Sequence, residues 1–353
     1  MLEFLKSTPT SRLKDYLAIA ISHLTVKKLF NIINTELNFA LRKEKLSSFP
    51  YLLTVDTINT CQLKCPLCAT GQGKHTRPQG KMDFKIFKKI IDEIGDYLLN
   101  VHLVWWGEPF LNQDILKYVN YAHKKNIGTF ISTNFSFPFN QEKMAAIIKS
   151  GLDVLAVSLD GITPEIYNKY RIGGNFHQVV KNIRLLTSLK KELHSKRPYV
   201  EWQFLVNKYN EHQVPKLATF NKKLGADSIV LEQLLILFGQ SNHNNTKLAD
   251  WLPKNKKYRP KKDSLLSNKS DNLPMGKCWW LWRSLALSHD GGVSPCCYNN
   301  LAKEDFGNIL KNNFRDIWNN KKYLSARALF RKKKKKVSLK TLCHSCPIAR
   351  TNG

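Results

Sequence analysis

The stretch CQLKCPLC (residues 61–68) carries three cysteines in the spacing Cys-x3-Cys-x2-Cys. It directly follows residues 52–56 (LLTVD), whose length and apolar, β-branched content predict a buried strand. Cys61, Cys65 and Cys68 are therefore expected on a loop at the carboxyl end of that strand, where parallel α/β architectures collect their catalytic groups. Three thiolates on one short loop can hold three irons of a four-iron cluster and leave the fourth iron open to a substrate.

Strand and helix patterns alternate along residues 51–235, which we take as one unit. Five further strands are predicted at residues 101–106, 128–132, 153–158, 200–206 and 228–231. Helical patterns lie between them, at residues 83–96, 113–125, 141–150, 174–190 and 211–224. Six strands that alternate with helices predict a parallel sheet, either as a partial barrel or as a doubly wound sheet.

Three other regions surround this α/β unit. Residues 1–50 predict an N-terminal helical extension. Residues 236–277 are rich in Asn, Lys, Ser and Pro, and they predict a linker or a substrate loop. Residues 278–353 predict a small C-terminal domain, with a hairpin over residues 288–296 and a helix near residues 314–330.

The formal net charge of +29 suggests a polyanionic partner, such as nucleic acid or anionic lipid. The lysines are spread over most helical segments, however, with one dense run at residues 331–336 (RKKKKK), so a solvated basic surface explains the charge without nucleic acid. No run approaches the roughly 20 apolar residues of a membrane span. Residues 16–24 (YLAIAISHL) predict a packing helix, and they leave peripheral membrane contact open.

Eight cysteines without a secretion-signal pattern indicate metal or redox chemistry rather than disulfides, and they predict a cytoplasmic protein. Four of them form the C-terminal pattern Cys278-x17-Cys296 and Cys343-x2-Cys346. Such a set satisfies tetrahedral zinc as well as an iron–sulfur cluster. A zinc-stabilised nucleic-acid-binding protein without catalysis is therefore one interpretation of this pattern.

The cysteine triplet and the motifs after it resemble the radical SAM superfamily, whose members cleave S-adenosylmethionine (SAM). Gly107-Glu108-Pro109 resembles the family's GGEP motif, with Trp106 in place of the first glycine, and implies a contact with the methionine amino group. Other residues at strand ends resemble further SAM contacts of the family: Ser132, Asn134, Ser158, Asp160 and Arg171. The resemblance implies a partial (β/α)6 TIM-like barrel and a SAM-binding [4Fe–4S] cluster on the triplet.

The C-terminal cysteines resemble the SPASM/Twitch auxiliary domain of the same superfamily. Residues 307–309 (GNI) and 317–319 (IWN) are typical of the stretch between its second and third ligands. The resemblance implies a second [4Fe–4S] cluster with four ligands, Cys278, Cys296, Cys343 and Cys346. Cys297 is then left over as a buried core residue, a ligand in place of its neighbour, or a hydrogen-atom donor to a substrate radical.

The chemistry that this resemblance implies begins with one electron from a flavodoxin- or ferredoxin-type reductant. SAM is cleaved to a 5′-deoxyadenosyl radical, which abstracts a hydrogen atom from the substrate. Oxidation would need a base, for which we propose Glu232 after the sixth strand, whereas epimerisation would need a hydrogen donor, for which we propose Cys297. We expect a small hydroxylated substrate, such as a sugar or cyclitol. The alternatives are a ribosomal peptide or protein side chain and, suggested only by the charge, RNA.

Overall fold

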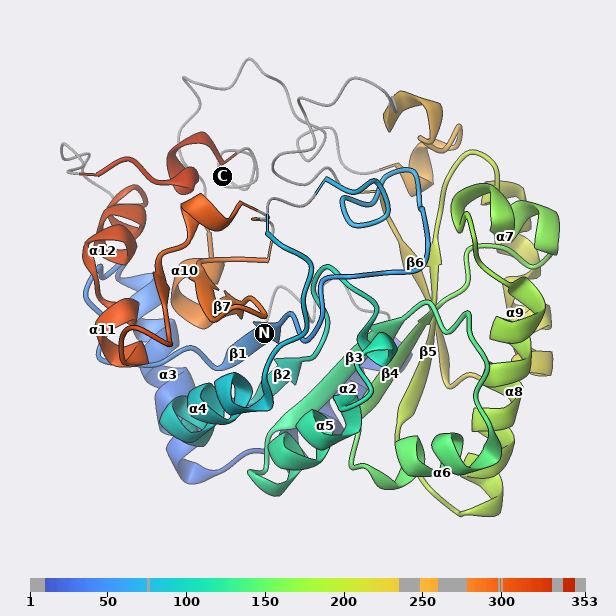
Figure 1. The fold of residues 1–353 in the computed structure, drawn as a ribbon, viewed down its shortest axis with the longest axis horizontal. Coiled ribbons are helices and arrows are strands. Elements are labelled where there is room, and N and C mark those ends of the chain that lie inside the picture. The colour runs from blue at the N-terminus through green and yellow to red at the C-terminus, as the bar shows by residue number, and fades with distance from the viewer. Residues whose placement is uncertain are drawn as a thin grey trace.

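The structure is a computed structural model, and it describes residues 10–74, 77–234, 248–259, 278–297, 299, 301–331 and 339–346. One nine-stranded sheet runs through these residues in the order β6-β5-β4-β3-β2-β1-β7-β8-β9 (Figure 1). Its strands are β1 Leu52–Val55, β2 Asn100–His102, β3 Gly128–Thr133, β4 Val154–Ser158, β5 Tyr199–Leu205, β6 Ser228–Glu232, β7 Ser284–Leu287, β8 Gly292–Ser294 and β9 Gly307–Asn308.

Strands β1 to β6 are parallel and follow one another in chain order, as the sequence predicts. Side chains alternate between the two faces of the sheet. In β5, Val200, Trp202 and Phe204 are fully buried in the core that the outer helices share. Glu201 and Gln203 alternate with these residues and point to the concave face, so polar side chains line the inside of the partial barrel.

The helices that follow the strands lie along the outer face of the sheet (Figure 1). They are α4 Phe84–Ile94, α5 Ile115–Lys124, α6 Gln141–Lys149, α7 Pro164–Tyr170, α8 Phe176–Glu192 and α9 Leu217–Leu224. Helix α4 illustrates why they form. The Asp83 side chain accepts a hydrogen bond from Lys85 N at its start. Its buried side chains recur at helical spacing: Ile86, Phe87, Ile90, Ile91 and Ile94.

The C-terminal region begins inside the barrel sheet. Strand β7 pairs in parallel with β1, from Leu52↔Ser284 to Val55↔Leu287, so the parallel part has seven strands rather than the six expected. Strands β7 and β8 then form the expected hairpin, with Gly291 at φ +82° in its turn. The first strand of the auxiliary domain therefore extends the sheet of the barrel.

The single helix expected near residues 314–330 is wrong, because two helices occupy that stretch. They are α11 Phe314–Trp318 and α12 Lys321–Ala328. The Asn320 side chain caps α12 by accepting from Tyr323 N, and Asn319 exchanges two hydrogen bonds with the backbone of Leu46. Asparagine side chains that bond to backbone in this way end one helix and start the next.

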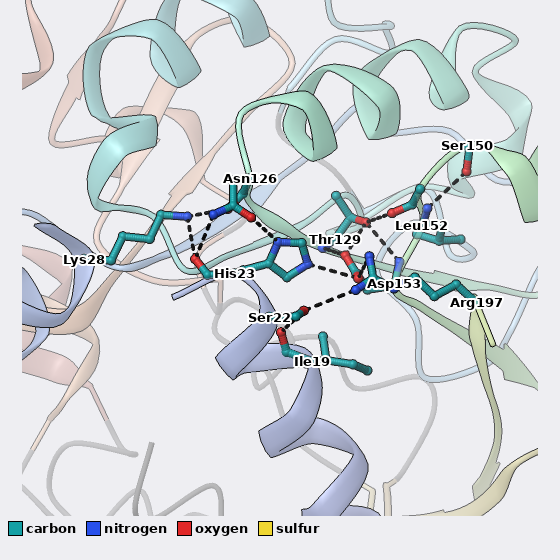
Figure 2. Close-up of polar contacts among 11 residues, drawn as sticks. Ile19, Ser22, His23, Lys28, Asn126, Thr129, Ser150, Leu152, Asp153 and Arg197 are labelled. Atoms are coloured by element: carbon teal, nitrogen blue, oxygen red, sulfur yellow. Dashed lines mark hydrogen bonds and ion pairs between the residues drawn. The ribbon is translucent and has the colours of Figure 1, made fainter. Parts of the chain in front are cut away.

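Helices α2 Thr10–Ser22 and α3 Val26–Ala40 close the amino ends of the strands. Figure 2 shows the contact: His23 Nε2 lies 3.0 Å and Arg197 Nη1 lies 2.9 Å from Asp153 Oδ1. Asp153 directly precedes β4 and Arg197 lies two residues before β5, so this polar network lies at the end of the barrel opposite to the cysteine loop. No single helix in the described residues is long and apolar enough to cross a membrane; α2 and α3 would suffice only as a pair, and they are bent by 118°.

Two predictions fall partly outside the described residues. Of residues 236–277, the structure describes 248–259, so the choice between linker and substrate loop is open for the rest. In the described part, the ring of Trp251 lies 5.3 Å from that of Tyr170, beside the cysteine loop. Of the basic run 331–336, only Arg331 is described.

Candidate active site

The cysteine triplet lies at the carboxyl end of β1. Cys65 is 5% exposed and packs with Leu63 and Tyr170, and Cys61 and Cys68 border the same small apolar cluster. Burial, with a smaller contribution from charge on the neighbouring thiols, raises the pKa of the Cys61 thiol to about 12. Burial likewise raises the pKa of Cys65 to about 11, although the nearby Arg171 guanidinium lowers it. The three thiols therefore lie within electrostatic range of one another in an apolar cradle, where a bound cation is needed to stabilise the thiolate forms.

Two glycines hold the backbone of this loop in place. A Cβ on Gly71 would lie 2.7 Å from Cys65 N, and a Cβ on Gly107 would lie 1.9 Å from Ile58 O. Glu108 N also donates to Thr60 O at 2.8 Å. The segment Gly107-Glu108-Pro109 is thus packed against the backbone just before Cys61, and residue 107 has no space for a side chain.

Glu108 ties this segment to the end of β3. Its Oε1 accepts hydrogen bonds from Thr133 Oγ1 at 2.6 Å and Phe110 N at 3.2 Å, and its Oε2 accepts from Asn134 N at 2.7 Å. Burial nevertheless raises the pKa of Glu108 to about 7. A buried carboxylate of this kind is stabilised by a cation, which suits the predicted contact with a methionine amino group.

Asn134 connects the end of β3 to the cysteine loop. Its Nδ2 lies 3.6 Å from Cys61 Sγ, and its Oδ1 accepts from Gln62 Nε2 at 2.9 Å. Leu63 N also donates to Cys61 Sγ, at 3.4 Å. Donors directed at a cysteine sulfur are the usual outer contacts of an iron–sulfur ligand.

A cavity of about 260 Å³ opens between the cysteine loop and the ends of β4, β5 and β6. It brings together four residues that the sequence analysis singled out, which are Ser158, Asp160, Arg171 and Glu232. The Asp160 carboxylate accepts a hydrogen bond from Arg171 Nε through Oδ2 and one from Leu205 N through Oδ1 at 2.7 Å. Asp160 therefore orients the Arg171 guanidinium at the wall of the cavity.

Tyr170 and Gln203 are among the lining residues of this cavity that the sequence analysis missed. Gln203 Oε1 accepts a hydrogen bond from Ser132 Oγ at 2.9 Å, so Ser132 acts on the cavity through Gln203. The sequence of β5 could have identified Gln203. Its outward positions are all apolar, so a polar residue at an inward position indicates a side chain that faces the interior of the partial barrel.

The C-terminal cysteines converge from three separate segments. Cys278 precedes α10 Trp280–Arg283, Cys296 follows β8, and Cys343 and Cys346 lie at the 3₁₀ turn η8 Leu342–Ser345. Burial raises the pKa of Cys296 well above its usual value, and charge on Cys297 and on the other three predicted ligands acts in the same direction. The four predicted ligands are thus gathered within electrostatic range of one another.

Thiolates are ligands both of a single zinc ion and of a four-iron cluster. In the part of the chain that the structure describes, no three His, Cys, Asp or Glu side chains are arranged to hold one metal ion. The chemistry of the two cysteine sets fits either group.

Two contacts join the two sites. Trp105 Nε1, next to the Gly107 segment, donates to Cys297 O at 2.6 Å. Arg77, which is 6% exposed, pairs with Asp290 and Asp305 of the C-terminal region. Cys297 itself lies beside Cys296 in a half-buried position, and loss of solvation raises the pKa of its thiol to about 12. Its roles as core residue, ligand or hydrogen donor all stay predictions.

Comparison with known proteins agrees with this geometry. Residues 55–196 match the radical SAM superfamily, and residues 278–347 match the iron–sulfur cluster-binding SPASM domain. The chain contains a radical SAM domain followed by an iron–sulfur cluster-binding SPASM domain. The predicted family and fold class are confirmed, and the two matches imply a SAM-binding [4Fe–4S] cluster and an auxiliary cluster, as expected.

Several curated proteins are similar to this radical SAM chain. A tungsten-containing aldehyde ferredoxin oxidoreductase cofactor-modifying protein of Pyrococcus furiosus is 26% identical over 188 residues, which cover 52% of each chain. The mycofactocin maturase MftC of Mycobacterium ulcerans is 30% identical over 139 residues, or 39% of this chain and 37% of the relative. The chain thus spans about half of the first relative and less of the second.

Solved structures share the fold. SuiB of Streptococcus suis, bound to SAM, has a TM-score of 0.59 at 16% identity, covering 80% of this chain and 68% of that one. The structure anSMEcpe with bound AdoMet has a TM-score of 0.56 at 16% identity, covering 78% and 82%. At these identities the likeness concerns the fold of the radical SAM and SPASM units.

Proposed function

We propose that this chain cleaves SAM reductively at Cys61, Cys65 and Cys68 and modifies a peptide or protein side chain. The observation that carries the first part is the convergence of the cysteine loop, the Gly107 segment and the cavity of about 260 Å³ at one end of the sheet. The thiols of Cys61, Cys65 and Cys68 would hold the cluster, which would supply the electron for reductive cleavage of SAM and thereby the radical chemistry on the substrate.

The residues of the chain bind and orient SAM in this proposal. Arg171, held by Asp160, faces the SAM carboxylate as a charge-assisted donor. Ser158 and Gln203 offer polar groups on the wall of the same cavity. Trp251 and Tyr170 lie edge to face beside the cysteine loop and exclude water from the space where the radical forms.

The choice of a peptide substrate rests on what similar proteins bind. SuiB has been solved with its precursor peptide SuiA, and that structure has a TM-score of 0.60 with 83% of this chain. The structure anSMEcpe has been solved with a Kp18Cys peptide, with a TM-score of 0.54. The sugar or cyclitol substrate, expected from the sequence, stays a prediction.

The final step depends on two candidate residues. Glu232 lines the cavity at the end of β6, where it can accept a proton if the substrate radical is oxidised. Cys297 lies beside the auxiliary ligands, where it can return a hydrogen atom if the substrate is epimerised. Glu232→Gln would then suppress only oxidation, and Cys297→Ala only epimerisation.

The decisive experiment is anaerobic reconstitution of the full chain and of Cys65→Ala, followed by SAM and dithionite. Two four-iron clusters give about eight irons per chain, and we expect 5′-deoxyadenosine from the parent and none from the variant. Cys297→Ala is the matched control, because it removes a thiol outside the triplet and should still form 5′-deoxyadenosine. Bound zinc in place of iron, or no 5′-deoxyadenosine from the fully loaded parent, would contradict the proposal and favour a zinc-stabilised binding protein.

The substrate is tested with the same loaded protein. Synthetic peptides encoded by short reading frames beside the gene are added, and peptide mass and 5′-deoxyadenosine are measured together. A mass change on the peptide with stimulated SAM cleavage supports peptide modification. Stimulation by a panel of sugars and cyclitols, with the peptides inert, would instead favour the small hydroxylated substrate.

A further inference from the structure

Helix α3 is packed with its polar side chains inward. Its buried residues are Lys28, Asn31, Ile32, Thr35 and Asn38. Its exposed face is an apolar stripe, with exposed fractions of 72% at Val26, 44% at Leu29, 67% at Phe30, 48% at Ile33, 56% at Leu37 and 66% at Leu41. These residues recur at intervals of three and four, so they share one face of the helix. Such an exposed apolar stripe on a surface helix marks an interaction site.

The orientation of α3 is fixed by its buried hydrogen bonds. Lys28 Nζ donates to His23 O at 3.1 Å and to Asn126 O, as Figure 2 shows. Asn31 exchanges two hydrogen bonds with the backbone of Phe49, at 2.9 and 3.0 Å. Rotating the helix to bury the apolar stripe would leave these groups without hydrogen-bond partners, and burial of unpaired polar groups is unfavourable. The stripe is therefore held outward by the fold.

A basic cavity lies at the carboxyl end of the same helix. It has a volume of about 630 Å³ and is lined by Leu41, the last residue of the apolar stripe, by Leu324, and by five charged residues, Arg42, Lys43, Glu44, Lys45 and Arg331. Four of these five are cationic, and Glu44 pairs with Arg331. An apolar stripe that runs into a basic hollow matches the two layers of an anionic bilayer, namely acyl chains and phosphates.

We propose that the apolar stripe and the basic cavity dock this protein on an anionic phospholipid bilayer. The charge of the chain favours this occupant over a second copy, because two chains of formal charge +29 repel each other whereas an anionic surface attracts each of them. The α2–α3 corner is joined to residues that precede β3, β4 and β5, through His23 to Asn126 and Asp153 and through Ser22 to Arg197. Docking therefore takes place away from the cavity at the carboxyl ends of the strands and does not depend on the reaction.

The test is co-sedimentation of the loaded full chain with vesicles of phosphatidylglycerol and phosphatidylcholine, or of phosphatidylcholine alone. We expect binding to the anionic vesicles, at least tenfold weaker binding to the neutral ones, and a decline with added salt. Phe30→Gln/Leu37→Gln removes two exposed apolar side chains and should weaken binding at least tenfold. Leu193→Gln/Leu231→Gln is the matched control, since its leucines are 42% and 43% exposed on other elements, and it should bind like the parent.

A second pair of variants tests the basic cavity. Lys43→Gln/Lys45→Gln and Lys222→Gln/Lys223→Gln each lower the formal charge from +29 to +27 (29 − 2), but only the first pair lines the cavity. We expect the first pair to weaken binding severalfold more than the second, with SAM cleavage unchanged in both.

Three results would overturn the proposal. They are no binding of the parent to anionic vesicles, equal effects of the stripe variant and its control, and equal binding to neutral vesicles. Sedimentation velocity tests the alternative that the apolar stripe binds a second copy of this chain. That alternative would hold if the parent is a dimer that does not bind vesicles and if Phe30→Gln/Leu37→Gln converts it to a monomer. Loss of SAM cleavage with vesicle binding intact would affect only the proposed function.

Discussion

The two cysteine sites of this chain are built in opposite ways. The triplet occupies eight residues of one loop, whose backbone is fixed by the close contacts of Gly71 and Gly107. The auxiliary set runs from Cys278 to Cys346 and is assembled only when β7, β8 and the η8 turn have come together. The geometry of the first site is thus set by the local backbone, whereas the second site forms only when the whole C-terminal region has folded.

Cys343→Ala should produce the largest difference between the sites. It removes one ligand of the assembled set, and a cluster that loses a ligand is not retained by segments that it helps to hold together. Iron should fall from about eight to about four per chain, while SAM cleavage without substrate persists at the triplet. Iron analysis and 5′-deoxyadenosine formation measure both effects in one preparation.

The matched variant is Cys297→Ala, which removes a neighbouring thiol that is not one of the four predicted ligands. It should keep about eight irons. If Cys297→Ala loses the auxiliary iron and Cys296→Ala retains it, Cys297 is the ligand and the predicted assignment is wrong.

Gly107→Ala should damage the first site alone. The new Cβ would lie 1.9 Å from Ile58 O, so the backbone that leads into Cys61 has to move. A displacement near 1 Å at a reacting group can cost about 100-fold in rate, and we expect a loss of that order in SAM cleavage with the auxiliary iron retained. Gly73→Ala is the control, because a Cβ there meets nothing within 4 Å and costs only the strain of φ +63°, about 1 kcal/mol. Equal losses in both variants would contradict a role for this close contact.

The contrast between the sites also explains how much the sequence alone could predict. The triplet and its strand were found because their spacing and order are local, and the six parallel strands followed from short apolar, β-branched runs that alternate with helical patterns. The pairing of β7 with β1 was missed, because it joins residues far apart in the chain and has no local signature. Residues 16–24 were expected to pack inward, yet Ile21 is 66% exposed, because the polar network around His23 decides the orientation. Periodicity identifies an apolar face but does not state where that face points.

Arg77→Met tests the contact that locks the two regions together. Arg77 is almost fully buried between Asp290 and Asp305, and burial already raises the pKa of Asp305. Removing one partner of a buried pair costs about 3–5 kcal/mol, and we expect the lower end because the Asp290 side chain is 40% exposed. Chemical denaturation followed by circular dichroism measures the change. The control is Lys81→Met, which breaks an ion pair whose partners are 48% and 52% exposed and should lower the free energy of unfolding by at most about 1 kcal/mol. Equal losses of stability in the two variants would mean that Arg77 does not hold the two regions together.

Trp105→Phe should have the smallest effect and the most specific one. It keeps an aromatic ring beside Trp106 and removes the single hydrogen bond from Nε1 to Cys297 O. One hydrogen bond contributes about 1 kcal/mol, and the carbonyl left without a donor adds a penalty of up to similar size because the bond is partly buried. If the sites are coupled through the shared sheet, this variant should lower the free energy of unfolding by about 1–2 kcal/mol and leave iron content and SAM cleavage unchanged. If the variant releases the auxiliary iron, the coupling between the two cysteine sites depends on this hydrogen bond. The parallel pairing of β1 with β7 is then not enough to hold the auxiliary site in place.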